Sequence, residues 1–145
     1  MSHWLSFWNK DTRRLNGPLL QGDAVSAIYI PYGKQRVSRG DIIYCVGIEN
    51  GDLRLITRLH AASLNDDLDH RESVWVDYVE GEAVDADFQR VMPSAVVTAI
   101  LYLHVDGSEH RVRLGRGGRV LPHAFQGRSS IRELASGFQA LDALL

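Results

Sequence analysis

Short runs of β-branched, aromatic and other apolar residues recur along most of the chain, and turn residues separate them. Several runs alternate apolar with polar positions, as a β-strand does when one of its faces is buried. Runs of this length, bounded by glycine, proline, asparagine or aspartate, indicate strands. The pattern predicts seven of them, at residues 3–8, 24–30, 41–48, 53–60, 74–79, 96–105 and 109–114.

Two connections between these strands carry the residues of tight hairpins. Asn50-Gly51 joins the third strand to the fourth, and Asp106-Gly107 separates two alternating runs. Such pairs tolerate the positive φ angles that tight turns require. We therefore expect the third and fourth strands, and the sixth and seventh, to pair antiparallel.

The last segment differs, because its apolar residues recur at helical spacing. Residues 130–133, Ser-Ile-Arg-Glu, match a helix capping box. The apolar stripe that follows is Ile131, Leu134, Phe138, Leu141 and Leu145. This stripe predicts a C-terminal helix that packs on the sheet. Residues 9–22 are expected to form a loop, and residues 31–40 a connector with room for one helical turn.

The chain has 145 residues, of which 45% are apolar and 23% charged, with only 4 prolines. These values are typical of a globular protein, and the length is that of one domain. We therefore expect residues 1–145 to form a single domain of mostly β, α+β type.

Sequence features also bear on location. No apolar run approaches the roughly 20 residues needed to cross a bilayer. The charges of the N-terminal segment follow its apolar residues, the reverse of a secretory signal. The single cysteine, Cys45, can form no internal disulfide and no thiolate metal cage. We expect a cytoplasmic protein without membrane contact.

The formal net charge is −2, but the charges are unevenly distributed. Residues 65–87 contain nine acids and one base, Arg71, whereas residues 110–132 contain six arginines and no acid. A basic segment of this kind suits contacts with phosphate, although a solvated face paired with the acidic segment is the alternative. Arginine makes up 14 of the 16 basic residues, which fits forked phosphate contacts or simply a GC-rich genome.

The usual signatures of catalysis are missing from the sequence. The six histidines show no i, i+4 pair of a zinc protease, and no serine stands in Gly-x-Ser-x-Gly. The Asp66-Asp67-Leu68-Asp69 cluster lacks the glycine and the terminal glutamate of a calcium loop. These observations favour a binding module over an enzyme, with no metal and no cofactor.

Three features of the first 61 residues belong together: the N-terminal Trp4-Leu5, the Val-Ser-Arg-Gly-Asp-Ile-Ile-Tyr run over 37–44, and the returning strand over 53–61. This combination resembles the PUA-like superfamily and, within it, the EVE domains. The resemblance implies a small curved β-barrel, here with the C-terminal helix packed on it. It also implies nucleic-acid binding and an aromatic pocket for a modified base. The motif of the related amide-cleaving ASCH domains is not matched, since residues 33–36 lack its glutamate.

The resemblance and the charge pattern suggest where nucleic acid would bind. Candidate aromatic walls of a base pocket are Trp8, Tyr32 and Trp75, and Asn9 would read a base edge with its donor and acceptor. These aromatic residues would equally suit the core or edge of a small barrel. The candidate phosphate contacts are Lys34, Arg36, Arg39, Arg111, Arg113, Arg116 and Arg119.

We therefore expect a non-catalytic nucleic-acid-binding module that reads a modified base. The alternative is a protein-interaction module that docks a partner through the acidic 65–87 segment or through the C-terminal helix. Binding to phosphate weakens steeply with salt, whereas an apolar docking surface is far less sensitive.

Overall fold

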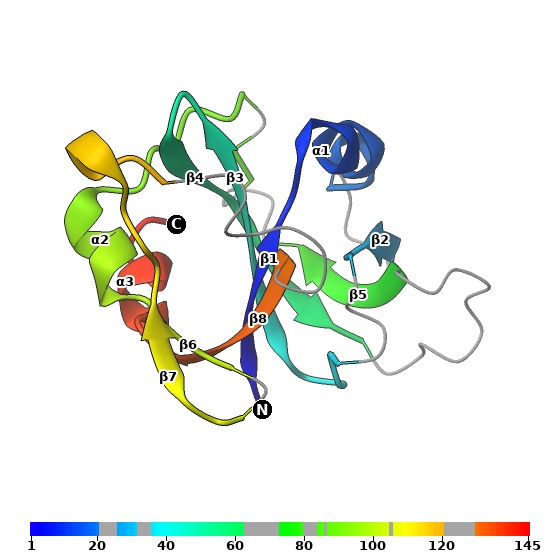
Figure 1. Ribbon diagram of the computed structural model, residues 1–145. Helices are drawn as coiled ribbons and strands as arrows, with labels where there is room; N and C mark the ends of the chain where they lie inside the picture. The colour runs from blue at the N-terminus through cyan, green and yellow to red at the C-terminus, as the bar shows by residue number, and fades with distance from the viewer. Residues whose placement is uncertain are drawn as a thin grey trace.

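A computed structural model of the chain describes residues 1–20, 26–31, 36–62, 73–79, 84–85, 87–104, 106–120 and 130–145 (Figure 1). Short helices lie between groups of strands along it. In chain order they are β1 (His3–Phe7), α1 (Lys10–Asn16), the 3₁₀ helix η1 (Gly17–Leu20), β2 (Ser26–Tyr29), β3 (Ile42–Glu49), β4 (Asp52–Ala61), β5 (Ser73–Val79), α2 (Ser94–Ala99), β6 (Leu101–Leu103), β7 (Glu109–Arg111), the 3₁₀ helix η3 (Arg116–Gly118), β8 (Ile131–Ser136) and α3 (Phe138–Asp142).

The strands form one mixed sheet in the order β2-β5-β4-β3-β1-β8-β6-β7. Among the strands that the structure describes, only β1 and β3 run parallel, and the other neighbours are antiparallel. The predicted mostly β, α+β class is confirmed. Within the described residues the end strands β2 and β7 do not pair with each other, so the sheet is not closed into the predicted barrel.

Both faces of the central strands are buried, because a separate apolar core covers each face. In β1, Trp4 belongs to one core and Leu5 to the other, and in β3 the same division separates Ile43 from Tyr44. In Figure 1, α1 lies on one side of the central strands, and α2 and α3 lie on the other. A strand buried on both faces reads as a continuous apolar run, as the Ile-Ile-Tyr-Cys-Val of β3 does.

The sulfur-bearing residue of β3, Cys45, lies in the core beside α1 and is fully buried. Burial raises the pKa of its thiol well above the ordinary value, because the thiolate would lose its hydration. Cys45 therefore stays a neutral, apolar-like core residue.

The two predicted hairpins are confirmed. Asn50 and Gly51 have φ angles of 54° and 80°, and they connect β3 to β4 in the register Glu49 opposite Asp52. Two consecutive positive φ angles are the signature of a type I′ turn. Gly107, with φ of 83°, lies in the turn between the antiparallel strands β6 and β7.

The predicted C-terminal helix is wrong over its first half. Residues 131–136 form β8, which pairs with β1 on one side and with β6 on the other. Ile131 and Leu134 are three residues apart, so on a strand they point to opposite faces, and each enters a different core. Hydrogen bonding to two neighbouring strands prevails over helical spacing here.

A short helix does follow this strand. Gly137, with φ of 94°, ends β8, and α3 places Leu141 in the core with no exposed surface. The C-terminal helix is therefore part of the fold, and docking of a partner through it stays a prediction.

Side-chain contacts hold α3 against the sheet. The Tyr44 hydroxyl and the Arg58 guanidinium both donate to Asp142 Oδ1, each at 2.7 Å. The ring of Phe138 stacks on His3 with 4.0 Å between centroids. Burial, reinforced by the bond to Asp142, raises the pKa of Tyr44.

Three other predictions need correction. Residues 10–20 form α1 and η1, where a loop was expected, because Asn9 caps the helix. Residues 94–99 form α2, and β6 begins only at Leu101, since packing of Val97 and Ile100 in the core overrides their β propensity. The seventh strand ends at Arg111, three residues earlier than predicted. No helix among the described residues is long and apolar enough to cross a membrane.

Candidate functional site

The Gly40-Asp41 step, which carries the family resemblance, has a structural role. Gly40 adopts a φ of 83°, and the carboxylate of Asp41 is only 4% exposed. The Ser2 N–H donates to Asp41 Oδ1 at 2.9 Å. The Trp4 indole N–H and the Ser38 N–H donate to Oδ2 at 2.9 and 2.8 Å. One buried carboxylate thus joins the start of β1 to the segment before β3.

Two of the predicted base-contacting residues lie at the end of β1, and both are engaged by the protein itself. Trp8 is 1% exposed, and its indole N–H donates to the Ser6 hydroxyl at 3.1 Å. The Asn9 side chain accepts from the Thr12 N–H at 2.8 Å and so caps α1. Trp8 is thus a buried core residue here, whereas Asn9 is exposed.

The other two base-contacting residues are not fully described. Tyr32 lies outside the described residues, as does the side chain of Trp75, whose backbone in β5 is opposite Ala27 of β2. Only Trp8 and Asn9 can therefore be placed with their side chains, and the role of the four residues as a base pocket stays a prediction. The acidic 65–87 segment also lies largely outside the described residues.

A ring that sequence reasoning missed lies beside the end of β1. Phe88 has a φ of 54°, which is strained for a bulky side chain, and it is 9% exposed. The guanidinium of Arg13 lies 3.9 Å from its ring centroid, and that of Arg54 lies 5.6 Å away. A Cβ atom on Gly47 would come within 2.8 Å of Phe88 Cζ. Glycine at this position lets the ring lie on the backbone of β3.

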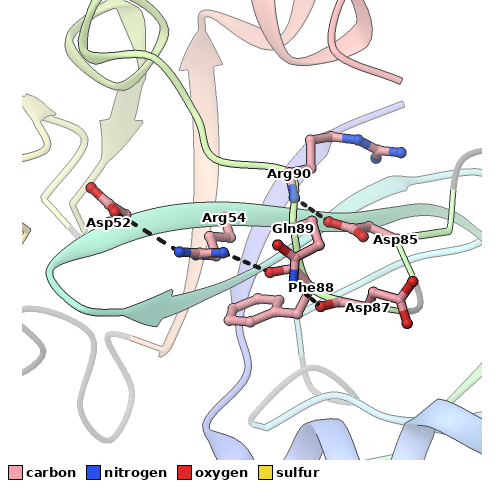
Figure 2. A network of polar contacts seen from close by, with 7 residues as sticks. All are labelled: Asp52, Arg54, Asp85, Asp87, Phe88, Gln89 and Arg90. Carbon is pink, nitrogen blue, oxygen red and sulfur yellow. Dashed lines mark hydrogen bonds and ion pairs between the residues drawn. The ribbon is translucent and has the colours of Figure 1, made fainter.

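Figure 2 shows how the chain around Phe88 is held on β4. Arg54 donates from Nη1 to the Phe88 carbonyl at 2.8 Å, and its Nη2 lies 3.9 Å from Asp52 Oδ2. The Arg90 N–H donates to the Asp85 carboxylate, and Gln89 Nε2 donates to the Asp87 carbonyl at 2.9 Å. Burial lowers the pKa of Arg13, and the charge of Glu49 opposes this shift.

A second cluster of rings lies on the hairpin of β6 and β7. The ring centroids of His104 and His110 are 3.9 Å apart, and Tyr102 lies 5.8 Å from the first and 6.0 Å from the second. The Arg132 guanidinium, from β8, lies 4.1 Å from the centroid of Tyr102. Four planar groups are therefore gathered here, with His104 exposed and the other three half-buried.

The turn of this hairpin adds a chain of hydrogen bonds. The N–H and the hydroxyl of Ser108 both contact Asp106 Oδ1, at 2.9 and 2.5 Å. The same hydroxyl lies 2.9 Å from His110 Nε2. The bonds from Ser108 lower the pKa of Asp106, so its carboxylate is ionised at neutral pH.

The predicted phosphate contacts divide into two groups. Arg36 contacts two strands of the fold. Its Nη1 donates to the Ile131 carbonyl at 3.0 Å, and its guanidinium lies 5.1 Å from the centroid of the Trp4 ring. Arg39 is exposed, and Lys34 lies outside the described residues. The second group is exposed along residues 111–119, next to the ring cluster. It consists of Arg111, Arg113, Arg116 and Arg119.

Within this group Arg111 is also tied to α2, because its Nη1 donates to the Thr98 carbonyl at 2.5 Å. Val112 is buried between the exposed Arg111 and Arg113, although β7 ends at Arg111. The sequence contained a signal for the ring cluster. Positions 102 and 104 share one face of a strand, and a turn at 106–107 brings position 110 beside them.

Comparison of the chain with family models, with curated proteins and with solved structures gave no match. Among the described residues, no group of three or more His, Cys, Asp or Glu side chains is arranged to hold a metal ion.

Proposed function

We propose that this protein is a nucleic-acid-binding module that contacts unpaired bases and phosphates through the β6–β7 hairpin. The observation that carries the proposal is the ring cluster beside exposed arginines. Tyr102, His104 and His110 offer rings, Arg132 offers a planar cation, and the arginines of 111–119 face solvent.

The chemistry of nucleic acid matches this surface. Unpaired bases stack on aromatic rings and on guanidinium planes, and each stacked base contributes about 1–3 kcal/mol. Arginines bind the phosphates that flank such bases, which supplies affinity for any sequence. A net charge of −2 does not oppose the binding of nucleic acid, because the local basic surface governs how a phosphate backbone approaches the protein.

Recognition of a modified base in a PUA-like fold is the finer form of the proposal. It rests on the resemblance of the first 61 residues and on the aromatic groups at the end of β1. Trp8 and Phe88 belong to one core there, and Asn9 is the next residue along the chain. A base that entered between Arg13 and Arg54 would have to displace the ring of Phe88. The positive φ of Phe88 stores backbone strain of order 1–3 kcal/mol, which is released only if the backbone of this segment moves as well.

The experiment is fluorescence anisotropy with labelled single-stranded RNA and DNA, carrying ordinary or modified bases, over a series of salt concentrations. We expect affinity to fall steeply with salt. The double variant Arg111→Ala/Arg113→Ala should bind more weakly and lose about 0.7 of the logarithmic salt slope for each phosphate contact removed. The matched control is Arg14→Ala, an exposed arginine on α1 at the other side of the sheet.

Tyr102→Leu tests the stacking contribution, because leucine keeps the apolar contact with the core. It should weaken binding while leaving the salt slope unchanged. Dissociation constants no tighter than about 10⁻⁴ M at low salt, for every oligonucleotide, would contradict the proposal. If the double arginine variant bound as tightly as the wild-type protein, the interface would lie elsewhere than on this hairpin.

A further inference from the structure

The two histidines of the hairpin have an arrangement that simple stacking does not require. His104 and His110 lie 3.9 Å apart between ring centroids, and a hydrogen-bonded chain connects one of them to a carboxylate. Imidazole ordinarily changes its charge between about pH 5 and 8, so a pair of them beside a phosphate site affects how binding depends on pH.

The hydrogen-bond chain fixes which nitrogen of His110 carries a proton. The ionised carboxylate of Asp106 can only accept, so the Ser108 hydroxyl donates its single hydrogen to it. The Ser108 oxygen can then only accept from His110, which places a hydrogen on Nε2. The free nitrogen of neutral His110 is therefore Nδ1, and a further proton must go there.

Several charged groups lie near the pair in the structure or along the chain, and they act in opposite directions. From the turn, the negative charge of Asp106 favours protonation of His110 through Ser108. Arg132 of β8 lies across Tyr102, and Arg111 and Glu109 flank His110 in β7. Each imidazole also opposes protonation of the other, because like charges at this separation repel.

We propose that His104 and His110 form a proton-coupled contact for a nucleic-acid phosphate, which binds with uptake of protons by this pair. The inference rests on the proposed function and adds how this site works. A phosphodiester beside the rings offsets their mutual repulsion, and it favours the charged form of each imidazole in contact with it. By linkage, a ligand that brings protons with it binds more tightly as pH falls.

The test measures the dissociation constant of labelled oligothymidylate at constant ionic strength between about pH 5.5 and 8, the range in which imidazole titrates. Thymine does not titrate there. As pH falls, the dissociation constant of the wild-type protein should decrease roughly tenfold for each pH unit over which one proton is taken up on binding. For the double variant His104→Gln/His110→Gln, the dissociation constant should change less than about twofold per pH unit. Glutamine keeps a polar planar group but does not change its charge in this range.

His60→Gln, a substitution in β4 remote from this hairpin, is the matched control and should keep the wild-type pH dependence. A second readout does not involve binding. Nitrogen NMR of the free protein at neutral pH should show His110 as the Nε2–H tautomer, and Ser108→Ala should remove that preference.

The outcomes separate the two proposals. Binding with equal pH dependence in the wild-type protein and the double variant overturns the proton-coupled contact and leaves the nucleic-acid function standing. Absence of binding at every pH overturns both. Loss of pH dependence in the double variant alone, with the control unchanged, supports the inference.

Discussion

At the scale of single residues, the side chains that hold this fold together are polar groups placed in apolar surroundings. Asp41 accepts three hydrogen bonds, two from the N-terminal segment with β1 and one from the segment before β3. Asp142 accepts from Tyr44 and Arg58. Each acceptor orders segments that are far apart in sequence. At the buried Asp41 site, loss of the carboxylate leaves its donors unsatisfied, which costs more than an average hydrogen bond is worth.

Asp41→Ala should lower the free energy of unfolding by about 2–4 kcal/mol, because three donors lose a charged acceptor. Asp41→Asn keeps one carbonyl acceptor and should lose less. Urea unfolding followed by tryptophan fluorescence measures both. A loss below about 0.5 kcal/mol for the alanine variant, the range of an ordinary surface substitution, would show that Asp41 does not anchor β1.

Tyr44 should make stability depend on alkaline pH. Its pKa is raised in the folded protein by burial and by the bond to Asp142, so the unfolded chain releases this proton first. The contribution is fully present below the unfolded value of about 10 and is lost as pH rises above it.

The measurement is urea unfolding at pH 8 and at about pH 10.5, above the unfolded tyrosine value, for the wild-type protein and Tyr44→Phe. The Cys45 thiol, whose pKa is also raised, contributes a loss from about pH 8.5 in both proteins, so the difference between them isolates Tyr44. Equal losses in the two proteins would contradict the assignment.

At the scale of elements, the junction between β8 and α3 decides how the C-terminal segment folds. Gly137 adopts a φ of 94°, and a Cβ atom there would lie 2.6 Å from the Ala99 carbonyl oxygen. The glycine thus serves two purposes, since it turns the chain from strand to helix and lets it pass close to the end of α2.

Gly137→Ala should therefore be more destabilising than the same change at Gly107. Both positions have positive φ, but a Cβ on Gly107 meets nothing within 4 Å. Gly107→Ala should cost about 1–2 kcal/mol from backbone conformation alone. Gly137→Ala should cost about 1–3 kcal/mol more, because the backbone of α2 cannot yield as a flexible side chain would. Equal thermal unfolding midpoints for the two variants would refute the close approach.

The elements show which sequence signals are reliable. The strands around 42–49 and 52–61 and their Asn-Gly turn were predictable, because alternation, apolar content and turn chemistry agree there. The segment over 130–145 was not, since Ile131 and Leu134 fit a helical stripe and a strand between two cores equally well. The same ambiguity hid α2, whose β-branched residues favour a strand until tertiary packing is known.

The candidate site was predictable only in part. The exposed arginines of 111–119 followed from charge and alternation. The burial of Trp8 did not, because an aromatic residue at a strand end suits a core and a pocket alike. Phe88 carries no periodic signal, and its place over Gly47 depends on contacts between residues about forty positions apart.

At the scale of the whole molecule, one sheet with two cores divides the protein into two sides. One side, with α1, contains the Arg13–Phe88–Arg54 stack, and the other, with α2 and α3, contains the hairpin rings. β1 and β3 contribute to both cores. A disturbance on one side therefore reaches the other through the shared strands.

The place of Cys45 in β3 makes it a built-in kinetic reporter of this division. A thiol-specific reagent can reach it only when the sheet opens, because the side chain is fully buried and its thiolate is disfavoured. Labelling of the native protein should be slower than that of the urea-unfolded protein by roughly the equilibrium constant for opening, about 10³–10⁸ for a small domain. If α1 detached without the rest, labelling would be fast while the near-ultraviolet signal of α3 and its tyrosine contact persisted. The labelling rate, compared with the near-ultraviolet signal, therefore tells whether the two cores unfold together or in succession.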